Sequence, residues 1–423
     1  MARVMIAVMP FAGHVAPMVA VVREFIARGH DVRVYTGSAH ANSFRSVGVT
    51  VVPWREAPDF DELSLEATFP QLRGRKGPRQ TLANLEHLFI RTGAAQHRDL
   101  TREWVAAPWD VLLADSLSCG AALIAETTRA PWATLSLVPL TSPSRDLPPA
   151  GLALQPARGP FGRVRDAILR RVFSLLTLGL HRAWNEIRET AGLARTSTRF
   201  DRAWFSPTLT CVTGLASLDY PRSDLPTTTH YVGLIRTAPP AAVDHPAWWM
   251  DVETATVPVV HVTQGTFNVD PEDLIRPTLT GLADADVLSV VTTGRASQST
   301  LPFPAPRNAR IAGILPYDEL FPLTSVVITN GGWGGVLLAL GAGIPLIVAG
   351  GDIDKPEIAA RVAYSGAGID LRTGRPSPKA IAAAYRRIAT EDSFRVAAKR
   401  IGRELAASKG ASDVVDRCER LVG

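Results

Sequence analysis

A glycine-rich run at positions 330–335 carries the clearest chemical signal in the sequence. It follows the apolar segment Val326–Thr329 and precedes the apolar run Val336–Leu340, so the pattern predicts a strand, a tight turn and a helix. Glycines let a backbone approach a ligand closely, and a helix start presents unpaired N–H groups and the positive end of the helix dipole. A diphosphate fits such a site, although glycines needed only for close packing would leave the same pattern. The run reads Asn330, Gly331, Gly332, Trp333, Gly334 and Gly335.

Two further segments end predicted strands with groups that could contact the same ligand. Gly265 and Thr266 follow the apolar segment 259–263 and are candidate phosphate contacts. Asp354 and Lys355 follow the apolar segment 345–349 and begin a predicted helix. Because the carboxyl ends of parallel strands lie at one edge of a sheet, this carboxylate and ammonium could meet sugar hydroxyls there. Simple capping of the helix by Asp354 explains the pattern equally well.

An imidazole and a carboxylate in the first half of the chain could form a proton-transferring pair. His14 lies in the turn after the predicted strand 4–9, and Asp115 ends the predicted strand 110–115. A histidine with a pKa near neutrality suits a general base, and a neighbouring carboxylate would orient its ring. Since both residues follow strands, we expect them at one edge of a sheet. A lone histidine is often structural, so both interpretations stay open.

Metal and dinucleotide sites find little support in the sequence. Two Asp-x-Asp pairs, Asp284 with Asp286 and Asp352 with Asp354, could hold a divalent ion, but neither adjoins another clear ligand. The first strand-to-helix turn, Met9–His14, lacks the G-x-G-x-x-G pattern of dinucleotide-binding oxidoreductases. We therefore predict no metal and no cofactor, and any nucleotide would be a co-substrate.

Apolar strands alternate with amphipathic helices twice along the chain. Helices are expected at 15–27 and 118–129 in the first half, and at 271–284, capped by Asp270, in the second. Short apolar strands between helices are typical of parallel sheets covered on both faces. The sequence therefore predicts an α/β fold of two Rossmann-like, doubly wound domains facing each other across a cleft. The expected strands are 4–9, 31–36, 47–53, 110–115, 132–139, 257–263, 287–292, 310–315, 326–329 and 345–349.

Length and composition limit the class of protein. The 423 residues suit two domains of about 200 residues each. The sequence has neither a signal-peptide pattern nor an apolar run long enough to span a membrane. The three cysteines, Cys119, Cys211 and Cys418, form no disulfide or zinc pattern, which favours a reducing cytoplasm. The net charge of +5 is mostly dispersed and no aromatic-basic motif appears, so nucleic acid is not a predicted partner.

One basic stretch stands out after the loop expected at about 141–160. Its arginines are interspersed with apolar side chains such as Phe161 and Ile168. This pattern is typical of a solvated helix face, and it also suits a basic amphipathic surface in weak contact with anionic lipid. The arginines are Arg158, Arg163, Arg165, Arg170 and Arg171.

Three segments resemble the family 1 glycosyltransferases, which are UDP-glycosyltransferase-like enzymes with a GT-B fold. They are residues 13–17, the strand that ends at Asp115, and the stretch 315–368. The branch that this chain resembles is that of bacterial macrolide- and antibiotic-modifying enzymes. The run at 330–335 together with Asp354 and Lys355 is similar to that of rifamycin-type glycosyltransferases. The resemblance covers essentially the whole chain.

The resemblance implies a division of the chain and a role for each part. Residues 1–232 would bind the acceptor, 233–247 would be a linker around Pro239-Pro240, and 248–410 would bind the donor. The last helix, 411–423, would return to the first domain.

The resemblance also implies a mechanism. His14 would deprotonate the acceptor hydroxyl, Asp115 would compensate the imidazolium, and attack would invert the anomeric carbon. The backbone around Leu315 would meet the base and Asp354 the sugar hydroxyls. The helix start at 334–335, and not a metal, would stabilise the departing diphosphate.

Four positions depart from the family pattern. The family commonly has His at Asn330, Ser or Thr at Gly335, Glu at Leu338 and Gln at Lys355. The Asn330 amide can still donate a hydrogen bond to phosphate. Leu338 cannot bind ribose hydroxyls, so the ribose must be held by other groups.

The predicted function is that of an inverting, metal-independent O-glycosyltransferase. It would move a hexose from UDP-glucose, or from another UDP- or dTDP-sugar, to a hydroxyl of a hydrophobic natural product such as a polyketide, macrolide or phenolic. Two alternatives remain open. The basic stretch suits a peripheral-membrane glycolipid glycosyltransferase, and the departures at Gly335 and Leu338 suit a catalytically silent nucleotide-sugar-binding protein.

Overall fold

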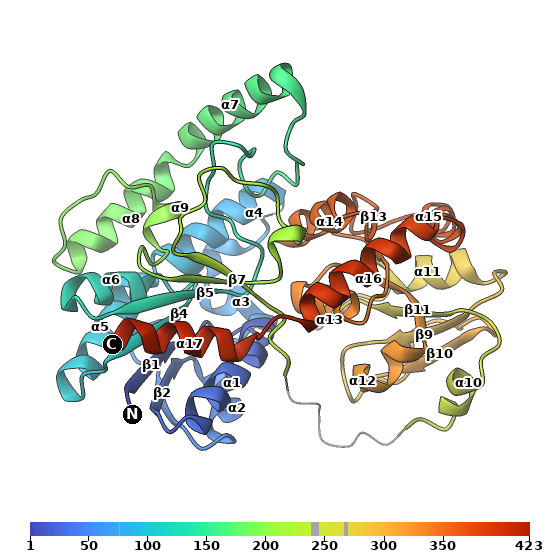
Figure 1. Cartoon of the computed structure of the whole chain (residues 1–423), viewed down its shortest axis with the longest axis horizontal. Coiled ribbons are helices and arrows are strands. Elements are labelled where there is room, and N and C mark those ends of the chain that lie inside the picture. Colours follow the sequence, from blue (N-terminus) through green and yellow to red (C-terminus); the bar gives the residue numbers. More distant parts are fainter. Residues whose placement is uncertain (76, 238–244, 266–269) are drawn as a thin grey trace.

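The computed structural model describes residues 1–75, 77–237, 245–265 and 270–423, and contains two parallel β-sheets flanked by helices (Figure 1). The first sheet has seven strands and the second has six. Neighbouring strands within each sheet run parallel. The predicted α/β class with two Rossmann-like sheets is confirmed.

The first sheet has the strand order β3-β2-β1-β4-β5-β6-β7. All five residues of β4 are buried, as expected for a strand covered by helices on both faces. The order reverses between β1 and β4, and in such sheets ligands bind beyond the carboxyl ends at this switch point. The strands are β1 (Arg3–Ala7), β2 (Asp31–Thr36), β3 (Thr50–Pro53), β4 (Val111–Asp115), β5 (Trp132–Ser136), β6 (Thr210–Thr213) and β7 (Thr229–Gly233).

The second sheet has the strand order β10-β9-β8-β11-β12-β13. Its switch point lies between β8 and β11, two central strands whose residues are nearly all buried. The strands are β8 (Val259–Thr263), β9 (Leu288–Thr292), β10 (Ala309–Ala312), β11 (Thr324–Thr329), β12 (Leu346–Val348) and β13 (Gly368–Asp370).

Helices connect the strands in both halves. Those of the first half are α1 (Ala12–Ala27), α2 (Ala41–Arg45), α3 (Leu65–Thr68), α4 (Gly77–Ala83), α5 (Gly93–Ala106), α6 (Cys119–Thr128), α7 (Gly159–Leu176), α8 (Leu178–Thr190) and α9 (Phe200–Ala203). The others are α10 (Trp249–Glu253), α11 (Ile275–Leu282), α12 (Tyr317–Leu320), α13 (Trp333–Gly341), α14 (Lys355–Tyr364), α15 (Pro378–Thr390), α16 (Asp392–Ala406) and α17 (Ala411–Val422). Shorter turns of helix are η1 (Ser38–His40), η2 (Glu62–Ser64), η3 (Pro70–Leu72), the π-helix η4 (Asn84–Ile90), η5 (Ala216–Leu218) and η6 (Phe321–Leu323).

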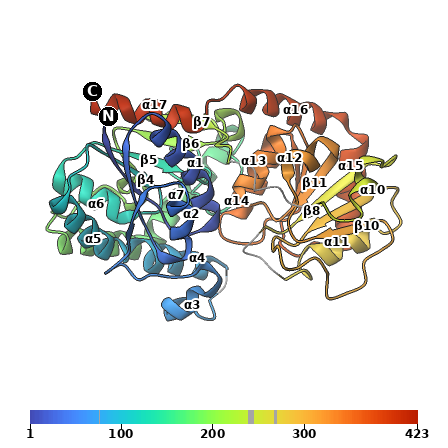
Figure 2. The ribbon, with the colours of Figure 1, turned by 90° about the horizontal axis from the view of Figure 1, so that it is seen from below.

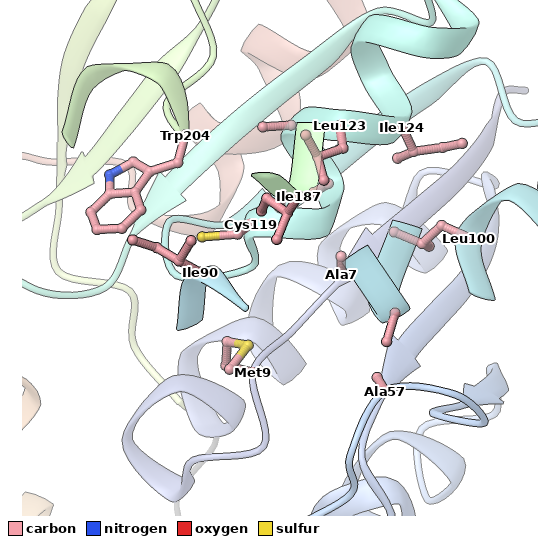
Figure 3. Packing of buried hydrophobic residues seen from close by; sticks show 14 of the residues in the cluster. Ala7, Met9, Ala57, Ile90, Leu100, Cys119, Leu123, Ile124, Ile187 and Trp204 are labelled. Carbon is pink, nitrogen blue, oxygen red and sulfur yellow. The ribbon is translucent and has the colours of Figure 1, made fainter. Parts of the chain in front are cut away.

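A hydrophobic core packs one face of the first sheet against α5, α6 and α8. Met9, Leu123 and Ile187 are among its buried members (Figure 3). Helices α5 and α6 approach each other closely because α6 has a glycine at the contact. A Cβ added to Gly120 would lie 2.3 Å from the Cβ of Gln96. This packing fixes the direction in which β1 and β4 end.

Several expected elements begin or end up to three residues away from the observed bounds, and two further differences concern a helix start and missing strands. The predicted start of the helix at 271–284 is wrong, because α11 begins at Ile275 and is preceded by turns. Asp270 accepts a hydrogen bond from the Glu272 N–H (3.0 Å), whereas the Ile275 N–H donates to Gln264 (3.0 Å). A side chain from the β8 end thus replaces the expected local cap. Strands β6, β7 and β13 have no counterpart among the expected strands.

The two halves of the chain are joined at several places. The last helix, α17, packs on α1 and on β4, β5 and β7 of the first sheet (Figure 2). Residues 238–244 of the expected linker and Thr266 lie outside the described residues. None of the described helices combines the length and the apolar character needed to cross a lipid bilayer.

Candidate active site

The glycine-rich run forms the turn from β11 into α13, at the switch point of the second sheet. Gly331 has a φ of +92°, and a Cβ there would lie 2.8 Å from the Val348 side chain. Gly332, Gly334 and Gly335 are exposed, and a Cβ at any of them would meet nothing within 4 Å among the residues that the structure describes, which do not include 266–269. These three glycines therefore serve no packing contact, and the space beside the first N–H groups of α13 is open. An open helix start at a switch point suits an anion.

The other side chains of the run are engaged within the protein. Asn330 is buried and its Nδ2 donates to the Gln264 carbonyl, which ties the turn after β11 to the turn after β8. Gly265, with a φ of +71°, lies next to that contact. The Trp333 indole is buried and its Nε1–H donates to Thr213 Oγ1 at 3.1 Å, across to the first half. A ligand at the turn would therefore meet backbone groups more than these two side chains.

Asp354 and Lys355 stand at the start of α14, at the same edge of the second sheet. Lys355 Nζ lies 3.3 Å from Asp352. Burial raises the pKa of Asp354, against the opposing effects of Lys355 and His14. Leu315, which follows β10, has its side chain in the core, so only its backbone could face a ligand. No cluster of three His, Cys, Asp or Glu side chains suitable for a metal occurs among the residues described.

His14 and Asp115 meet at the switch point of the first sheet. His14 lies in the first turn of α1, and its Nδ1 is 2.6 Å from Asp115 Oδ2. Asp115 is fully buried at the end of β4 and accepts N–H bonds from Met9 (3.3 Å) and Leu117 (3.0 Å). These bonds fix the carboxylate, and the carboxylate fixes the ring. With Nδ1 occupied, Nε2 is the ring nitrogen that can act on a ligand.

The surroundings of His14 set its protonation. Burial is the largest single effect and lowers the pKa of the imidazole, whereas the charge of Asp115 and its hydrogen bond raise that pKa. Asp354 and Glu62 add smaller effects in the same direction, so the pKa is raised above its ordinary value of 6.5. The influence of Asp354 is informative because this residue belongs to the second half. The charge at the start of α14 thus acts on His14 across the two halves.

Aromatic side chains beside His14 were not identified from the sequence. The Phe11 ring lies 5.6 Å from the His14 ring, 5.3 Å from the Phe60 ring and 6.2 Å from the Phe89 ring, measured between centroids. Phe60 precedes η2 and Phe89 belongs to the π-helix η4, an element found often at functional sites. No sequence pattern pairs these three positions, because they come from separate loops.

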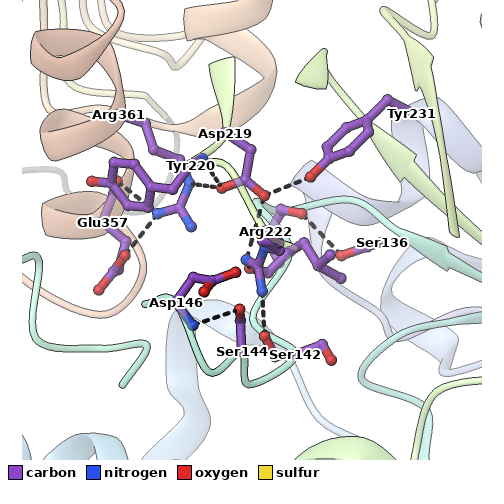
Figure 4. Close-up of polar contacts among 12 residues, drawn as sticks. Ser136, Ser142, Ser144, Asp146, Asp219, Tyr220, Arg222, Tyr231, Glu357 and Arg361 are labelled. Carbon is purple, nitrogen blue, oxygen red and sulfur yellow. Dashed lines mark hydrogen bonds and ion pairs between the residues drawn. The ribbon is translucent and has the colours of Figure 1, made fainter. Parts of the chain in front are cut away.

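A buried polar cluster links α14 to the first half and was also missed (Figure 4). Asp219 accepts bonds from Arg361 Nε (3.0 Å), Tyr231 Oη (2.6 Å) and Arg222 Nη2 (3.4 Å). Burial raises the pKa of Asp219, but the two arginines and the tyrosine outweigh it and lower that pKa below its ordinary value. Asp219 therefore stays charged and holds Arg361 of α14 in place.

Glu357, in the first turn of α14, binds the loop that precedes α7. Its Oε1 accepts the N–H groups of Gly151 (2.9 Å) and Ala153 (2.7 Å), and its Oε2 accepts a bond from Arg361 (2.7 Å). Ala153 has a φ of +53°, a left-handed conformation that costs a non-glycine residue about 1–2 kcal/mol. The carboxylate thus holds this loop in a shape that the chain does not favour by itself.

A cavity of about 650 Å³ lies beside α7 and is lined in part by Arg222 of the buried polar cluster. None of the side chains that the sequence singled out for catalysis or donor binding lines it. Its basic lining residues are Arg145, Arg163, Arg170 and Arg222.

Comparison with known proteins gives a family match and a relative of the same length. Residues 276–421 match the family described as "Erythromycin biosynthesis protein CIII-like, C-terminal domain". The 4'-demethylrebeccamycin synthase of Lentzea aerocolonigenes is 38% identical over 423 residues, which cover 100% of both chains.

Two solved structures share the architecture. The glycotransferase of kitacinnamycin has a TM-score of 0.78 and 19% identity, covering 100% of this chain and 99% of that one. Spinosyn rhamnosyltransferase SpnG complexed with thymidine diphosphate has a TM-score of 0.68 and 20% identity, covering 99% and 100%. These structures share the architecture of the chain, and the Lentzea relative is similar over the whole length of the chain. The chain therefore belongs to the GT-B glycosyltransferases of the erythromycin biosynthesis protein CIII-like family.

Proposed function

We propose that this glycosyltransferase transfers a hexose from a nucleoside diphosphate to a hydroxyl of a small molecule, with inversion. The observation that carries the proposal is the pairing of two half-sites. His14 is held by Asp115 at the switch point of the first sheet, and the open start of α13 lies at that of the second. The effect of Asp354 on the pKa of His14 supports a shared site, because Asp354 belongs to the second half.

In the proposed reaction each of these residues has one role. His14 Nε2 takes the proton of the acceptor hydroxyl as the oxygen attacks the anomeric carbon. The bond from that carbon to the diphosphate oxygen breaks as the new bond forms on the opposite face, which inverts the configuration. Asp115 stabilises the imidazolium through Nδ1–H. Asp354 and Lys355 would bind sugar hydroxyls at the start of α14.

Stabilisation of the leaving group would come from the protein alone. The departing diphosphate gains negative charge, and the first N–H groups of α13 and the helix dipole oppose that charge. Activity should therefore survive EDTA. Loss of turnover on chelation, restored by magnesium or manganese, would instead assign a metal to the pair Asp352 and Asp354.

The donor proposal starts from UDP-glucose, with dTDP-sugars as the second candidate. Leu338 is a half-buried member of the hydrophobic contacts on α13 and can bind no ribose hydroxyl. A deoxyribose lacks the 2'-hydroxyl, so this apolar side chain supports dTDP. The SpnG structure named above holds thymidine diphosphate. Calorimetry of UDP and dTDP separates the two, and tighter binding of dTDP would reassign the donor.

The acceptor would be a hydrophobic natural product. The ring of Phe11 lies beside His14, the rings of Phe60 and Phe89 pack against Phe11, and this aromatic group suits a flat apolar molecule. The name of the Lentzea relative refers to a demethylrebeccamycin. We place the chain near the macrolide-modifying and rifamycin-type enzymes on the glycine-run pattern, so polyketides, macrolides and phenolics belong in the acceptor panel.

Mass spectrometry of an acceptor panel with UDP-glucose and dTDP-sugars tests the proposal. The expected result is an acceptor mass increased by one sugar residue, absent with His14→Ala, and a product whose anomeric coupling in NMR shows inversion. Retained configuration would refute the mechanism. Nucleotide binding without transfer or donor hydrolysis across the panel would support the silent nucleotide-sugar-binding alternative.

A further inference from the structure

Helix α7 exposes an unusual number of apolar side chains. It extends away from the body of the first half (Figure 1), and Phe161 at its start is 91% exposed. Ile168 in its middle is 58% exposed and Leu175 at its end 68% exposed. The exposed apolar residues of α7 are Phe161, Val164, Ile168, Val172, Leu175 and Leu176. Large contiguous apolar patches on a protein surface usually mark an interaction site.

The exposed apolar residues lie on one side of the helix. At 100° per residue they fall within an arc of roughly 120°, which makes one stripe that also contains Arg165. The packed side lies elsewhere on the helix: Asp166 is buried there and accepts the Ala157 N–H at 3.1 Å. The stripe is therefore separate from the side of α7 on which Asp166 is buried.

Positive charge is concentrated in α7 and the loop before it. Residues 145–171 contain six arginines and two aspartates, a net charge of +4, whereas the whole chain has +5. Asp166 is paired with Arg165, and Asp146 accepts the Ser223 N–H. Both acidic groups are thus already engaged. Arg145, Arg163 and Arg170 line the cavity on the packed side of α7. Arg158 and Arg171 are exposed, and no ion pair joins either of them to a carboxylate among the described residues.

The positive charge distinguishes between two surfaces that could cover the stripe, a second copy of the chain and a lipid bilayer. In a two-fold dimer through α7, an antiparallel pairing about Ile168 would set Arg165 of one copy against Arg171 of the other. A parallel pairing would oppose each arginine to its own copy. Like charges brought together at an interface are unfavourable. An anionic lipid surface accepts apolar side chains and arginines at the same time.

We infer that α7 docks this glycosyltransferase on anionic lipid bilayers. The helix lies along the interface, with the stripe from Phe161 to Leu176 in the headgroup–acyl boundary and the flanking arginines at lipid phosphates. Binding is reversible and weakens as salt rises. The inference does not rest on the identity of donor or acceptor. It predicts that the first half of the molecule faces the membrane, where hydrophobic acceptors partition.

Co-sedimentation with vesicles tests the apolar stripe. Vesicles of phosphatidylglycerol mixed with phosphatidylcholine should sediment the full-length protein at low salt, and phosphatidylcholine alone should not. Phe161→Glu with Ile168→Glu should abolish binding. Val105→Glu on α5 and Val396→Glu on α16, at positions 78% and 64% exposed, are matched controls that should leave it unchanged. Thermal unfolding of each variant confirms that it folds.

Two further variants test the charge. Arg171→Gln and Arg158→Gln should each weaken vesicle binding by about fivefold, the usual effect of one basic residue at an anionic surface. Arg386→Gln, an exposed arginine on α15, should have no effect.

A fluorescent label gives a readout that does not depend on loss of function. The three native cysteines are buried, so Val164→Cys supplies the one exposed thiol for an environment-sensitive dye. The dye emission should shift to the blue when anionic vesicles are added, and a dye at Val105→Cys should not respond.

Three results would overturn the inference. The first is no sedimentation of the wild type with anionic vesicles. The second is sedimentation that the α7 variants leave intact. The third is a dimer in light scattering that Phe161→Glu dissociates, which would assign the stripe to a second copy of the chain.

Discussion

At the scale of single residues, the site depends on how firmly the His14 side chain is held in one orientation. Its Nδ1 is bound to a buried carboxylate, and that carboxylate is itself held by two backbone N–H groups. The ring orientation and the tautomer with a proton on Nδ1 both follow from these bonds. A histidine fixed in this way presents Nε2 as a base without any ordering step.

His14→Ala should lower turnover by roughly a hundredfold to ten-thousandfold, the usual contribution of a general base. The affinity for UDP or dTDP should not change, because the nucleotide would bind at the second sheet. Calorimetry and initial rates measure the two effects separately. His30→Ala, which removes a histidine bound to Glu419 at the other end of α1, is the control and should keep its rate. Weaker nucleotide binding at an unchanged rate would show that His14 is structural.

The rate should depend on pH through the same histidine. His14 accepts a proton only when neutral, so kcat/KM should fall as the pH drops through its pKa, which lies above 6.5. Asp115→Asn removes the charge that raises this pKa and leaves the effect of burial, which lowers it. The acidic limb should therefore move to lower pH while the maximal rate also falls. An acidic limb at the same pH in both proteins would mean that another group titrates.

At the scale of elements, helix starts carry the proposed donor site. Helix α13 begins at a turn whose exposed glycines leave its first N–H groups open, and α14 begins with Asp354 and Lys355 at the same edge. The two helices follow neighbouring strands, β11 and β12, so the parallel order of the sheet sets their starts side by side.

Gly334→Val should place a side chain in front of the α13 N–H groups. Nothing lies within 4 Å of a Cβ there, so the folded protein should tolerate the change. Nucleotide affinity should fall at least about tenfold, as expected when one hydrogen bond to a charged group is lost, and turnover should fall further. Calorimetry and rates test this. Gly179→Val, at an equally open glycine in α8, carries the same β-branched penalty and should leave both unchanged.

At the scale of the whole molecule, the two halves are held together by specific contacts. Trp333 reaches Thr213, Arg361 reaches Asp219, and Glu357 reaches the backbone of Gly151 and Ala153. Two of these contacts originate on α14, the helix that begins with the proposed sugar-binding residues. The position of the loop at 141–158 is therefore linked to the position of the donor side.

Glu357→Ala should release that loop. It removes the two hydrogen bonds from the loop to the carboxylate, each worth about 1.5–3 kcal/mol, together with the bond from Arg361. It also leaves Ala153 without the partner that fixes its left-handed conformation. Trypsin should then cleave after Arg145 and Arg158 at least about tenfold faster. Glu391→Ala, which removes an exposed ion pair with Arg387, is the control. Equal cleavage rates in both variants would show that Glu357 does not hold the loop.

The sequence by itself determined the elements whose signal is local. Alternating apolar strands and helices predicted the α/β class, because burial on both faces of a parallel sheet imposes that pattern on neighbouring residues. The run at 330–335 predicted a strand, a turn and a helix, and the structure has them at β11 and α13. The approach of His14 to Asp115 also followed from the sequence, because both residues lie at the carboxyl ends of parallel strands, which meet at one edge of the sheet.

The tertiary structure decided what depends on partners distant along the chain. Gln264, not Asp270, caps α11, and Trp333 binds Thr213 at 120 positions' distance. Glu357 meets Gly151 across 206 positions. Such contacts leave no periodic pattern in the sequence, because each of them depends on one side chain at a single position. Periodicity reports which face of an element is buried, and only the packed fold decides what that face meets.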